Sequence, residues 1–206
     1  MPSRFGPAML AEPMRILVLY AHPDPESYVA ALLRASLDAL SRAGHEVDLC
    51  DLYAEGFDPV LRLPERRSYH AVPENRRGVE DYVRRLEAAE RLLLVHPVWN
   101  FGYPAILKGF LDRVFLPGVS FRIEEGRVRP NLTHLRLLAA ITTYGAPRWR
   151  AMLVGDPPRR VTGRMLRVLA APRARFAYLA HYDMNRSTPE SRAAFLARVS
   201  HTIGGF

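Results

Sequence analysis

Short, continuous apolar runs separated by segments of helical period constrain the fold of this chain most strongly. Residues 15–20 read RILVLY, residues 91–96 read RLLLVH, and residues 135–141 form a third such run. Strands that are buried on both faces of a sheet have this unbroken apolar character. Between the runs, apolar residues recur at three- and four-residue steps, as on one face of a helix. The alternation predicts an α/β fold with a parallel sheet and right-handed crossovers.

Five strands and the helices between them can be placed along the chain. The strands are expected at residues 15–20, 45–50, 91–96, 135–141 and 176–182. The helices are expected at residues 29–43, 80–90, 105–115 and 161–169, and from residue 188 to about 203. Gly44 ends the first helix, and Ser187 with Glu190 forms a capping-box pattern at the start of the last. Residues 121–128 should form a small hairpin, and residues 51–75 an irregular loop.

The composition is typical of one globular domain. The chain has 206 residues, of which 49% are apolar and 24% are charged, and these values are ordinary for a soluble domain. We expect residues 1–13 to form a loose N-terminal tail and residues 14–206 to form a single domain. Cys50 is the only cysteine, so a reducing, cytoplasmic location is expected. We expect neither a secretory signal nor a membrane span, because no apolar run approaches about 18 residues.

The net charge of +8 comes almost entirely from arginine, since Lys108 is the only lysine. Nucleic acids, anionic membranes and phosphorylated ligands all attract basic proteins. Here the arginines are scattered as single residues and short pairs, without interleaved aromatic residues. A nucleic-acid interface concentrates its positive charge on one element. We therefore expect no nucleic-acid partner. Lys108 is expected to be an ordinary charge on a helix surface, and we assign it no catalytic role.

The residues that carry chemistry follow the predicted strands. In an open parallel sheet, ligands bind beyond the carboxyl ends of the strands, where the strand order reverses. For the strand order 2-1-3-4-5, this point lies between the first and third strands. Three loops should meet there, namely residues 22–28, residues 97–103 and residues 142–145. We expect a ligand site where the three loops converge.

The first of these loops leads into the first helix. Backbone N–H groups and the helix dipole favour an anion at such a helix start. Ser27 adds a hydroxyl there, and His22 adds a ring nitrogen. The alternative is purely structural, with Ser27 capping the helix and His22 bonding a loop carbonyl. The sequence alone leaves both interpretations open.

The second loop gathers aromatic rings, an amide and a glycine within residues 97–103. Such a set suits a planar cofactor, which needs apolar contact on its face and N–H donors at its polar edge. The alternative is an apolar lid over the sheet edge. The third loop offers the hydroxyls of Thr142 and Thr143 and a close approach of the backbone at Gly145, which could stabilise negative charge on a reduced cofactor. The alternative is an ordinary turn after a strand.

Residues 21–26 suggest a different chemistry. They read AHPDPE, which differs by one residue from the AHPDDE motif of zinc-dependent sugar-amide deacetylases. That motif supplies a His and an Asp as zinc ligands and a second Asp as a base. Here Pro25 replaces the second Asp, and the histidines are dispersed along the chain. Zinc-dependent deacetylation is therefore kept as a remote alternative, and no metal site is expected.

Three segments occur in the order and spacing of one known family. They are residues 16–61, residues 96–121 (HPVWNFGYPAILKGFLDRVFLPGVSF) and residues 141–147 (ITTYGAP), and the second is the most specific. The chain resembles the flavodoxin-fold NAD(P)H:quinone oxidoreductases, the DT-diaphorase-like group that includes ancillary oxidoreductases of potassium-efflux systems. The similarity covers most of residues 14–155. It implies a flavodoxin-like fold with five parallel strands in the order 2-1-3-4-5 and helices on both faces.

The resemblance also implies a reaction and a set of contacts. NAD(P)H would reduce a bound FAD or FMN, and a quinone or similar small acceptor would reoxidise it in a ping-pong cycle, within a homodimer. The implied contacts to the cofactor phosphate are His22, Ser27 and Tyr28. The implied contacts to the isoalloxazine ring are Val98, Trp99, Asn100, Phe101, Thr142, Thr143, Tyr144 and Gly145. Pro97 is also expected to contact the cofactor. Phe121 and Trp149 are expected beside the substrate.

Two departures from the family pattern affect this expectation. Val29 stands where the family often has Asn, so one polar contact to the cofactor is missing. Some members place a Tyr and a His after the Thr-Thr pair to balance charge on the reduced flavin. The corresponding stretch here is RWRAMLVGD, without a histidine. The candidates for charge stabilisation are therefore Arg148 or Arg150, with Tyr144 and Gly145.

Two other functions fit parts of the sequence. A flavodoxin-like electron carrier has a phosphate loop dense in Ser and Thr and an acidic docking face, whereas this chain offers only Ser27 and is basic. A redox-sensing regulatory subunit of a membrane transporter is compatible with an enzyme, so a transporter partner stays open.

Overall fold

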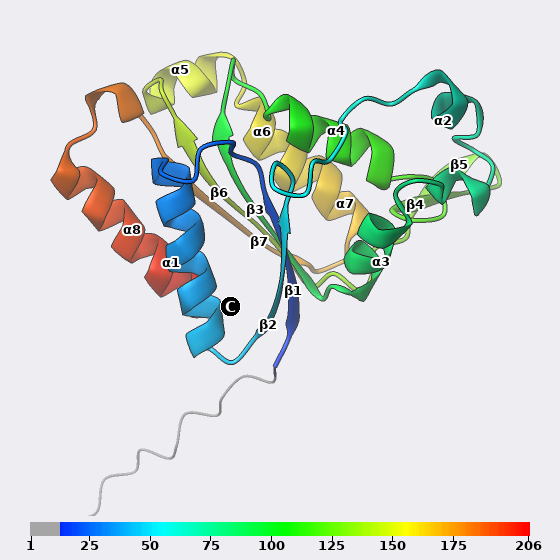
Figure 1. The fold of residues 1–206 in the computed structure, drawn as a ribbon, viewed down its shortest axis with the longest axis horizontal. Helices are drawn as coiled ribbons and strands as arrows, with labels where there is room; N and C mark the ends of the chain where they lie inside the picture. Colours follow the sequence, from blue (N-terminus) through cyan, green and yellow to red (C-terminus); the bar gives the residue numbers. More distant parts are fainter. Residues whose placement is uncertain (1–12) are drawn as a thin grey trace, which may run out of the picture.

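A five-stranded parallel sheet forms the centre of the protein (Figure 1), for which a computed structural model describes residues 13–206. The sheet neighbours, in the order β2-β1-β3-β6-β7, all pair in parallel. Counted along the chain, this is the predicted order 2-1-3-4-5, which is confirmed. The strands are β1 (Arg15–Tyr20), β2 (Glu46–Asp51), β3 (Arg91–Val98), β6 (Leu137–Tyr144) and β7 (Arg175–His181).

Helices cover both faces of the sheet, as predicted (Figure 1). One face carries α1 (Tyr28–Arg42) and α8 (Pro189–Ile203). The other carries α3 (Glu80–Ala88), α4 (Ala105–Val114), and a helical stretch of α6 (Pro157–Arg160), the π-helical turn Val161–Leu166 and α7 (Arg167–Leu169). The remaining elements are α2 (Leu63–Arg67), α5 (Arg148–Leu153), the 3-10 turns Glu74–Arg76 and Met184–Arg186, and the hairpin of β4 (Phe121–Glu124) and β5 (Arg127–Pro130).

Alternate residues of the central strands enter two separate hydrophobic cores. In β1, Leu17 and Leu19 join the core under α3 and α4, whereas Ile16 and Val18 join the core under α1 and α8. Successive side chains of a strand point to opposite faces, so a strand covered on both sides needs apolar residues throughout. The unbroken apolar run at residues 16–20 follows from this burial.

The strands β3 and β6 continue further than the sequence predicts. Their parallel pairing joins Pro97 with Thr143 and Val98 with Tyr144. Thr142 and Thr143 therefore lie inside a strand, which corrects the expectation that they form a loop. Pro97 and Val98 likewise belong to β3. Pro97 suggests a strand end in the sequence, because proline cannot donate to the ladder, but pairing with the neighbouring strand extends both elements.

The last helix begins at a different cap from the predicted one. Thr188, rather than Ser187, is the N-cap of α8, and its hydroxyl accepts a hydrogen bond from the Ser191 N–H at 3.2 Å. The Ser191 hydroxyl oxygen accepts from the Thr188 N–H at 3.0 Å. Pro189 takes the first helical position, which its fixed φ favours. Ser187 and Glu190 match the usual capping-box pattern, whereas Thr188 and Ser191 do not, so the pattern selects the wrong residue as N-cap.

Other differences concern connecting segments. Residues 51–75 contain α2 and the first residues of a 3-10 turn, so they are not wholly irregular. The helix expected from residue 161 begins at Pro157, and α5 is an additional helix. Of the predicted tail, residues 1–12 lie outside the described part of the chain. Within residues 13–206, no helix is both long and apolar enough to cross a bilayer.

Candidate functional site

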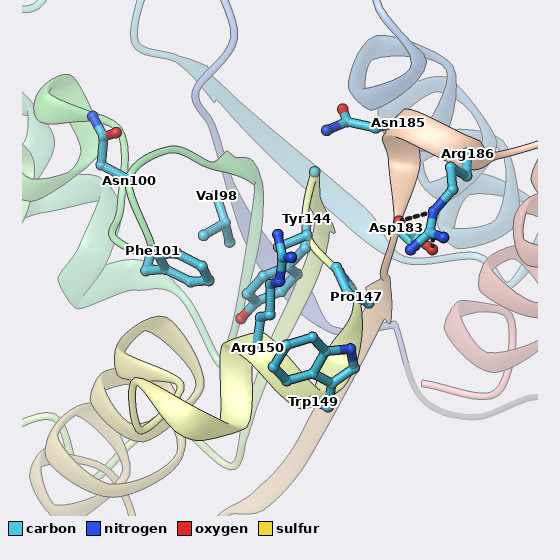
Figure 2. A pocket seen from close by; sticks show the side chains of 12 residues that line it. Val98, Asn100, Phe101, Tyr144, Pro147, Trp149, Arg150, Asp183, Asn185 and Arg186 are labelled. Carbon is cyan, nitrogen blue, oxygen red and sulfur yellow. Dashed lines mark hydrogen bonds and ion pairs between the residues drawn. The ribbon is translucent and has the colours of Figure 1, made fainter.

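A cavity of about 420 Å³ opens at the carboxyl ends of β3, β6 and β7 (Figure 2). The turn after β3, the segment from β6 into α5, and the link from β7 to α8 surround it. Because β3 lies between β1 and β6, the cavity is beside the point where the strand order reverses. The lining residues are Val98, Asn100, Phe101, Tyr144, Gly145, Ala146, Pro147, Trp149, Arg150, Asp183, Asn185 and Arg186.

The turn after β3 has an unusual backbone. Asn100 and Phe101 have φ angles of 50° and 57°, a region that bulky residues rarely occupy. Trp99 and Gly102 close the turn with two backbone hydrogen bonds of 3.2 Å and 2.8 Å. The N–H groups of Asn100 and Phe101 have no acceptor within residues 13–206. Figure 2 shows the Phe101 ring turned toward the cavity, while the Asn100 amide points away.

Tyr144 anchors the end of β6 beneath the cavity, and 1% of the residue is exposed. Its hydroxyl donates to Asp156 Oδ1 at 2.5 Å and lies 2.6 Å from the Tyr178 hydroxyl. Tyr182 stacks on the Tyr144 ring, with 4.6 Å between centroids, and donates to Asp156 Oδ2 at 3.3 Å. Burial, the neighbouring Tyr178 and the Asp156 carboxylate all raise the pKa of Tyr144. The Tyr144 hydroxyl therefore stays protonated and hydrogen-bonded to Asp156 and Tyr178.

The segment from Gly145 into α5 forms one wall of the cavity. A Cβ atom at Gly145 would lie 3.4 Å from Asn185 Oδ1, so this residue lies close to the link from β7 to α8. Trp149 is 61% exposed, and the Arg150 guanidinium lies 5.1 Å from the centroid of its ring. In Figure 2, both side chains stand at the same rim. They offer a planar apolar surface and a positive charge to an aromatic or anionic ligand.

Three lining residues in the link from β7 to α8 are missing from the sequence prediction. They are Asp183, Asn185 and Arg186. Asp183 has a φ of 62°, and its N–H donates to the Ala146 carbonyl at 3.0 Å, which ties the link to the segment after β6. Arg186 Nε lies 3.1 Å from Asp183 Oδ2. Their position after the fifth strand is the signal, since that strand ends at the same edge of the sheet.

The loop after β1 lies next to the turn after β3. The rings of His22 and Trp99 are 5.8 Å apart between centroids. His22 Nδ1 accepts a hydrogen bond from the Asp24 N–H at 3.0 Å, which is a bond within the loop. Within residues 13–206, no three His, Cys, Asp or Glu side chains are grouped to hold a metal ion.

Ser27 and Tyr28 have structural partners. The Ser27 hydroxyl oxygen accepts from the Ala30 N–H at 3.1 Å as the N-cap of α1. The Tyr28 hydroxyl donates to the Arg192 carbonyl of α8 at 2.7 Å, and burial raises the pKa of Tyr28 to about 12. Ser27 keeps its hydroxyl proton for a further acceptor, whereas the Tyr28 hydroxyl is engaged. Contact of these residues with a phosphate stays a prediction.

The cavity brings together only part of the predicted set. Thr142 is buried in β6, and its hydroxyl has no partner within residues 13–206. Arg148 lines a separate cavity, and Phe121 lines an apolar one beside the β4–β5 hairpin. The predicted residues that line the first cavity are Val98, Asn100, Phe101, Tyr144, Gly145, Trp149 and Arg150. Those outside it are His22, Ser27, Tyr28, Pro97, Trp99, Thr142, Thr143, Phe121 and Arg148.

The cavity fits the planar ring system that the family resemblance implies. Val98, Phe101 and Trp149 supply apolar surface for a ring face. The unpaired N–H groups of Asn100 and Phe101 can donate to acceptor atoms at a polar ring edge. The residues present are therefore compatible with a flavin.

Comparison with known proteins identifies the family of this chain. A family described as having a flavodoxin-like fold matches residues 14–195. The ribosyldihydronicotinamide dehydrogenase (quinone) of Pongo abelii is 33% identical over 151 residues, which cover 64% of this chain and 64% of the relative. NAD(P)H dehydrogenase (quinone) 1 of Cavia porcellus is 32% identical over 148 residues, covering 64% and 54%. The chain thus matches about half to two thirds of the length of these curated relatives.

A solved structure matches nearly the whole chain. The crystal structure of Smu.1420 from Streptococcus mutans UA159 has a TM-score of 0.82 and 30% identity, and the match covers 94% of this chain and 100% of that one. The family match over residues 14–195 includes every segment that surrounds the cavity. This chain therefore belongs to the family of proteins with a flavodoxin-like fold.

Proposed function

We propose that this protein is a flavin-dependent oxidoreductase that passes a hydride from NAD(P)H to a quinone or a similar small acceptor. The observation that carries the proposal is the cavity at the carboxyl ends of β3, β6 and β7, with unpaired N–H groups at Asn100 and Phe101 and an exposed Trp149 at its rim. The names of the two curated relatives describe quinone-linked dehydrogenases, which supports this class of reaction. FAD and FMN share the ring system, so the proposal covers both.

The residues of the cavity bind and orient the cofactor ring in this proposal. The N–H groups of Asn100 and Phe101 donate to its polar edge, and Val98 and Phe101 cover apolar ring atoms. Gly145 lets the backbone approach closely. When bound, the flavin supplies hydride acceptance and release at N5. Trp149 excludes water from the ring and offers a stacking surface to donor and acceptor in turn.

We further propose that a second copy of the chain completes the site. An apolar cavity of about 690 Å³ lies between α4, the β4–β5 hairpin and the α6–π-helical stretch. Val128 and Met165 at this cavity are 65% and 44% exposed, and such apolar surface marks interfaces. Phe121, expected beside the substrate, lines this cavity and not the first one. A homodimer would bring Phe121 to the site of its partner, and a monomer at micromolar concentration would contradict this.

Anaerobic mixing of flavin-loaded protein with NADPH or NADH tests the proposed reaction. We expect one equivalent of the nicotinamide to bleach the flavin absorption and a benzoquinone to restore it. A flavodoxin-like carrier has no nicotinamide activity, so its absorption would stay unchanged. Absorption that neither nicotinamide alters would contradict the proposal.

Arg150 and Arg148 provide a matched pair of variants. Arg150 lines the cavity and Arg148 does not. A positive charge beside the ring favours the negative charge that reduction adds. We therefore expect Arg150→Gln to lower the midpoint potential of the bound flavin, on the order of 20 mV, and Arg148→Gln to leave it unchanged. Redox titration with a reference dye measures both, and equal potentials in wild type and Arg150→Gln would remove Arg150 from this role.

A further inference from the structure

A second cavity, of about 460 Å³, gathers four arginines. Arg148 belongs to α5, Arg159 and Arg160 belong to α6, and Arg164 belongs to the π-helical turn. None of the four forms an ion pair within residues 13–206. Four positive charges around one cavity repel each other. An anion in the cavity would offset this repulsion.

The carboxylate in this cavity does not neutralise the arginines by direct pairing. It belongs to Asp156, which is 8% exposed and lines the cavity. Its two oxygens accept hydrogen bonds from the hydroxyls of Tyr144 and Tyr182. The negative charge of Asp156 is thus directed at the two tyrosine hydroxyls, and the guanidinium groups stay available to a ligand.

Contacts with the fold orient two of the arginines. The Arg159 guanidinium lies 5.4 Å from the centroid of the Tyr178 ring, a cation–π contact. Arg160 lies against Gly155, where an added Cβ atom would come within 3.1 Å of Arg160 Nη1. Gly155 has a φ of 85°, so a side chain there would also strain the backbone. The positions of these two guanidinium groups therefore depend on Tyr178 and Gly155.

Aromatic rings line the same cavity. Phe176 and Tyr182 both contribute to its wall. A Cβ atom at Gly163 would lie 2.8 Å from the Phe176 ring, so a larger residue at position 163 would clash with the ring. Aromatic surface beside guanidinium groups is the combination that recognises a base together with its phosphates.

We propose that this cavity binds a nucleotide through its phosphate groups and its base. Arg148, Arg159, Arg160 and Arg164 contact phosphate oxygens, and Phe176 and Tyr182 contact the base. Two sources share this chemistry: the 2′-phosphoadenosine end of NADPH, and a free nucleotide such as ADP. The inference goes beyond the proposed oxidoreductase function and does not require it, because binding is measured without turnover.

Isothermal titration calorimetry on the full-length protein as purified tests the proposal, with 2′-phospho-ADP-ribose and ADP as probes. We expect saturable binding of at least one probe. The double variant Arg159→Gln, Arg160→Gln should weaken it at least tenfold, since charge-assisted hydrogen bonds to phosphate are lost. The control Arg173→Gln, Arg175→Gln removes the same charge from exposed positions that do not line the cavity, and it should bind like wild type.

The two probes separate the sources of the ligand. Tighter binding of 2′-phospho-ADP-ribose, with competition by NADPH, assigns the cavity to the electron donor and predicts a preference for NADPH over NADH. Tighter binding of ADP assigns it to a free nucleotide. No saturable binding of either probe, or the same loss of affinity in both double variants, would overturn the proposal. Failure of the flavin to react with NAD(P)H would leave these binding results intact, so the two proposals fail separately.

Discussion

Replacing Asp156 with alanine is expected to lower the free energy of unfolding by about 3 kcal/mol. The variant removes the carboxylate that accepts from the buried hydroxyl of Tyr144 and from Tyr182. A buried donor left without an acceptor costs about 1–3 kcal/mol. Asp156 also has a φ of 47°, which Asp tolerates better than Ala. Urea unfolding followed by circular dichroism measures the loss.

Two further variants separate the network from a general packing defect. Asp156→Asn keeps an acceptor oxygen and should lose less than Asp156→Ala. Tyr182→Phe removes only the longer bond, so we expect a loss of about 1 kcal/mol.

Tyr144 immediately precedes Gly145 in the wall of the cavity, so Asp156→Ala should also weaken flavin binding. A change in unfolding free energy within about 0.5 kcal/mol, the range of ordinary surface substitutions, would contradict the role of Asp156.

Acid is expected to destabilise the protein by about 3 kcal/mol between pH 6.5 and pH 4, through His96. His96 is fully buried in β3, and its Nδ1–H donates to the Pro97 carbonyl at 2.8 Å. Its Nε2 has no partner within residues 13–206, so a proton added there would be a buried, unpaired charge. Burial lowers the pKa of His96 from 6.5 to about 4.

The sign of this effect follows from proton binding. Between pH 6.5 and pH 4, the unfolded chain binds a proton at His96 that the folded protein does not bind. Stability is therefore fully present above pH 6.5 and falls as the pH decreases toward 4. Burial also lowers the pKa of His181, which adds to the fall. Urea unfolding as a function of pH measures the slope.

Matched substitutions isolate the contribution of His96. His96→Gln removes the titrating ring, so the slope between pH 6.5 and pH 4 should become shallower, whatever its effect on stability at neutral pH. His70 is exposed, and His70→Gln should keep the wild-type slope. An unchanged slope in His96→Gln would contradict the assignment.

The central strands and the fold could be predicted because burial on both faces leaves a direct trace in the sequence. Residues 16–20 and 92–95 are apolar throughout for this reason, and the alternation of five strands with helices restricts the topology. The expected membership of a flavodoxin-fold family is confirmed by the match over residues 14–195. The loop with Asn100 and Phe101 was identifiable because aromatic residues and a glycine at a strand end are unusual.

The rest of the site depends on contacts between distant parts of the chain. The sequence prediction places Thr142 and Thr143 in the loop that ends at Gly145, but pairing with β3 makes them part of β6. Asp183 and Arg186 carry no motif, and they reach the cavity only because β7 pairs beside β6. Asp156 lies in a short stretch without periodicity, and its partner Tyr144 is identified by the folded structure alone.

The cofactor content of the purified protein tests the central claim most directly. The cavity at the carboxyl ends of β3, β6 and β7 is expected to hold one flavin per chain. The protein should therefore show the visible absorption of a flavin, and mass spectrometry of the released compound should identify FAD or FMN at one equivalent. A colourless protein that takes up neither FAD nor FMN on reconstitution would contradict the account.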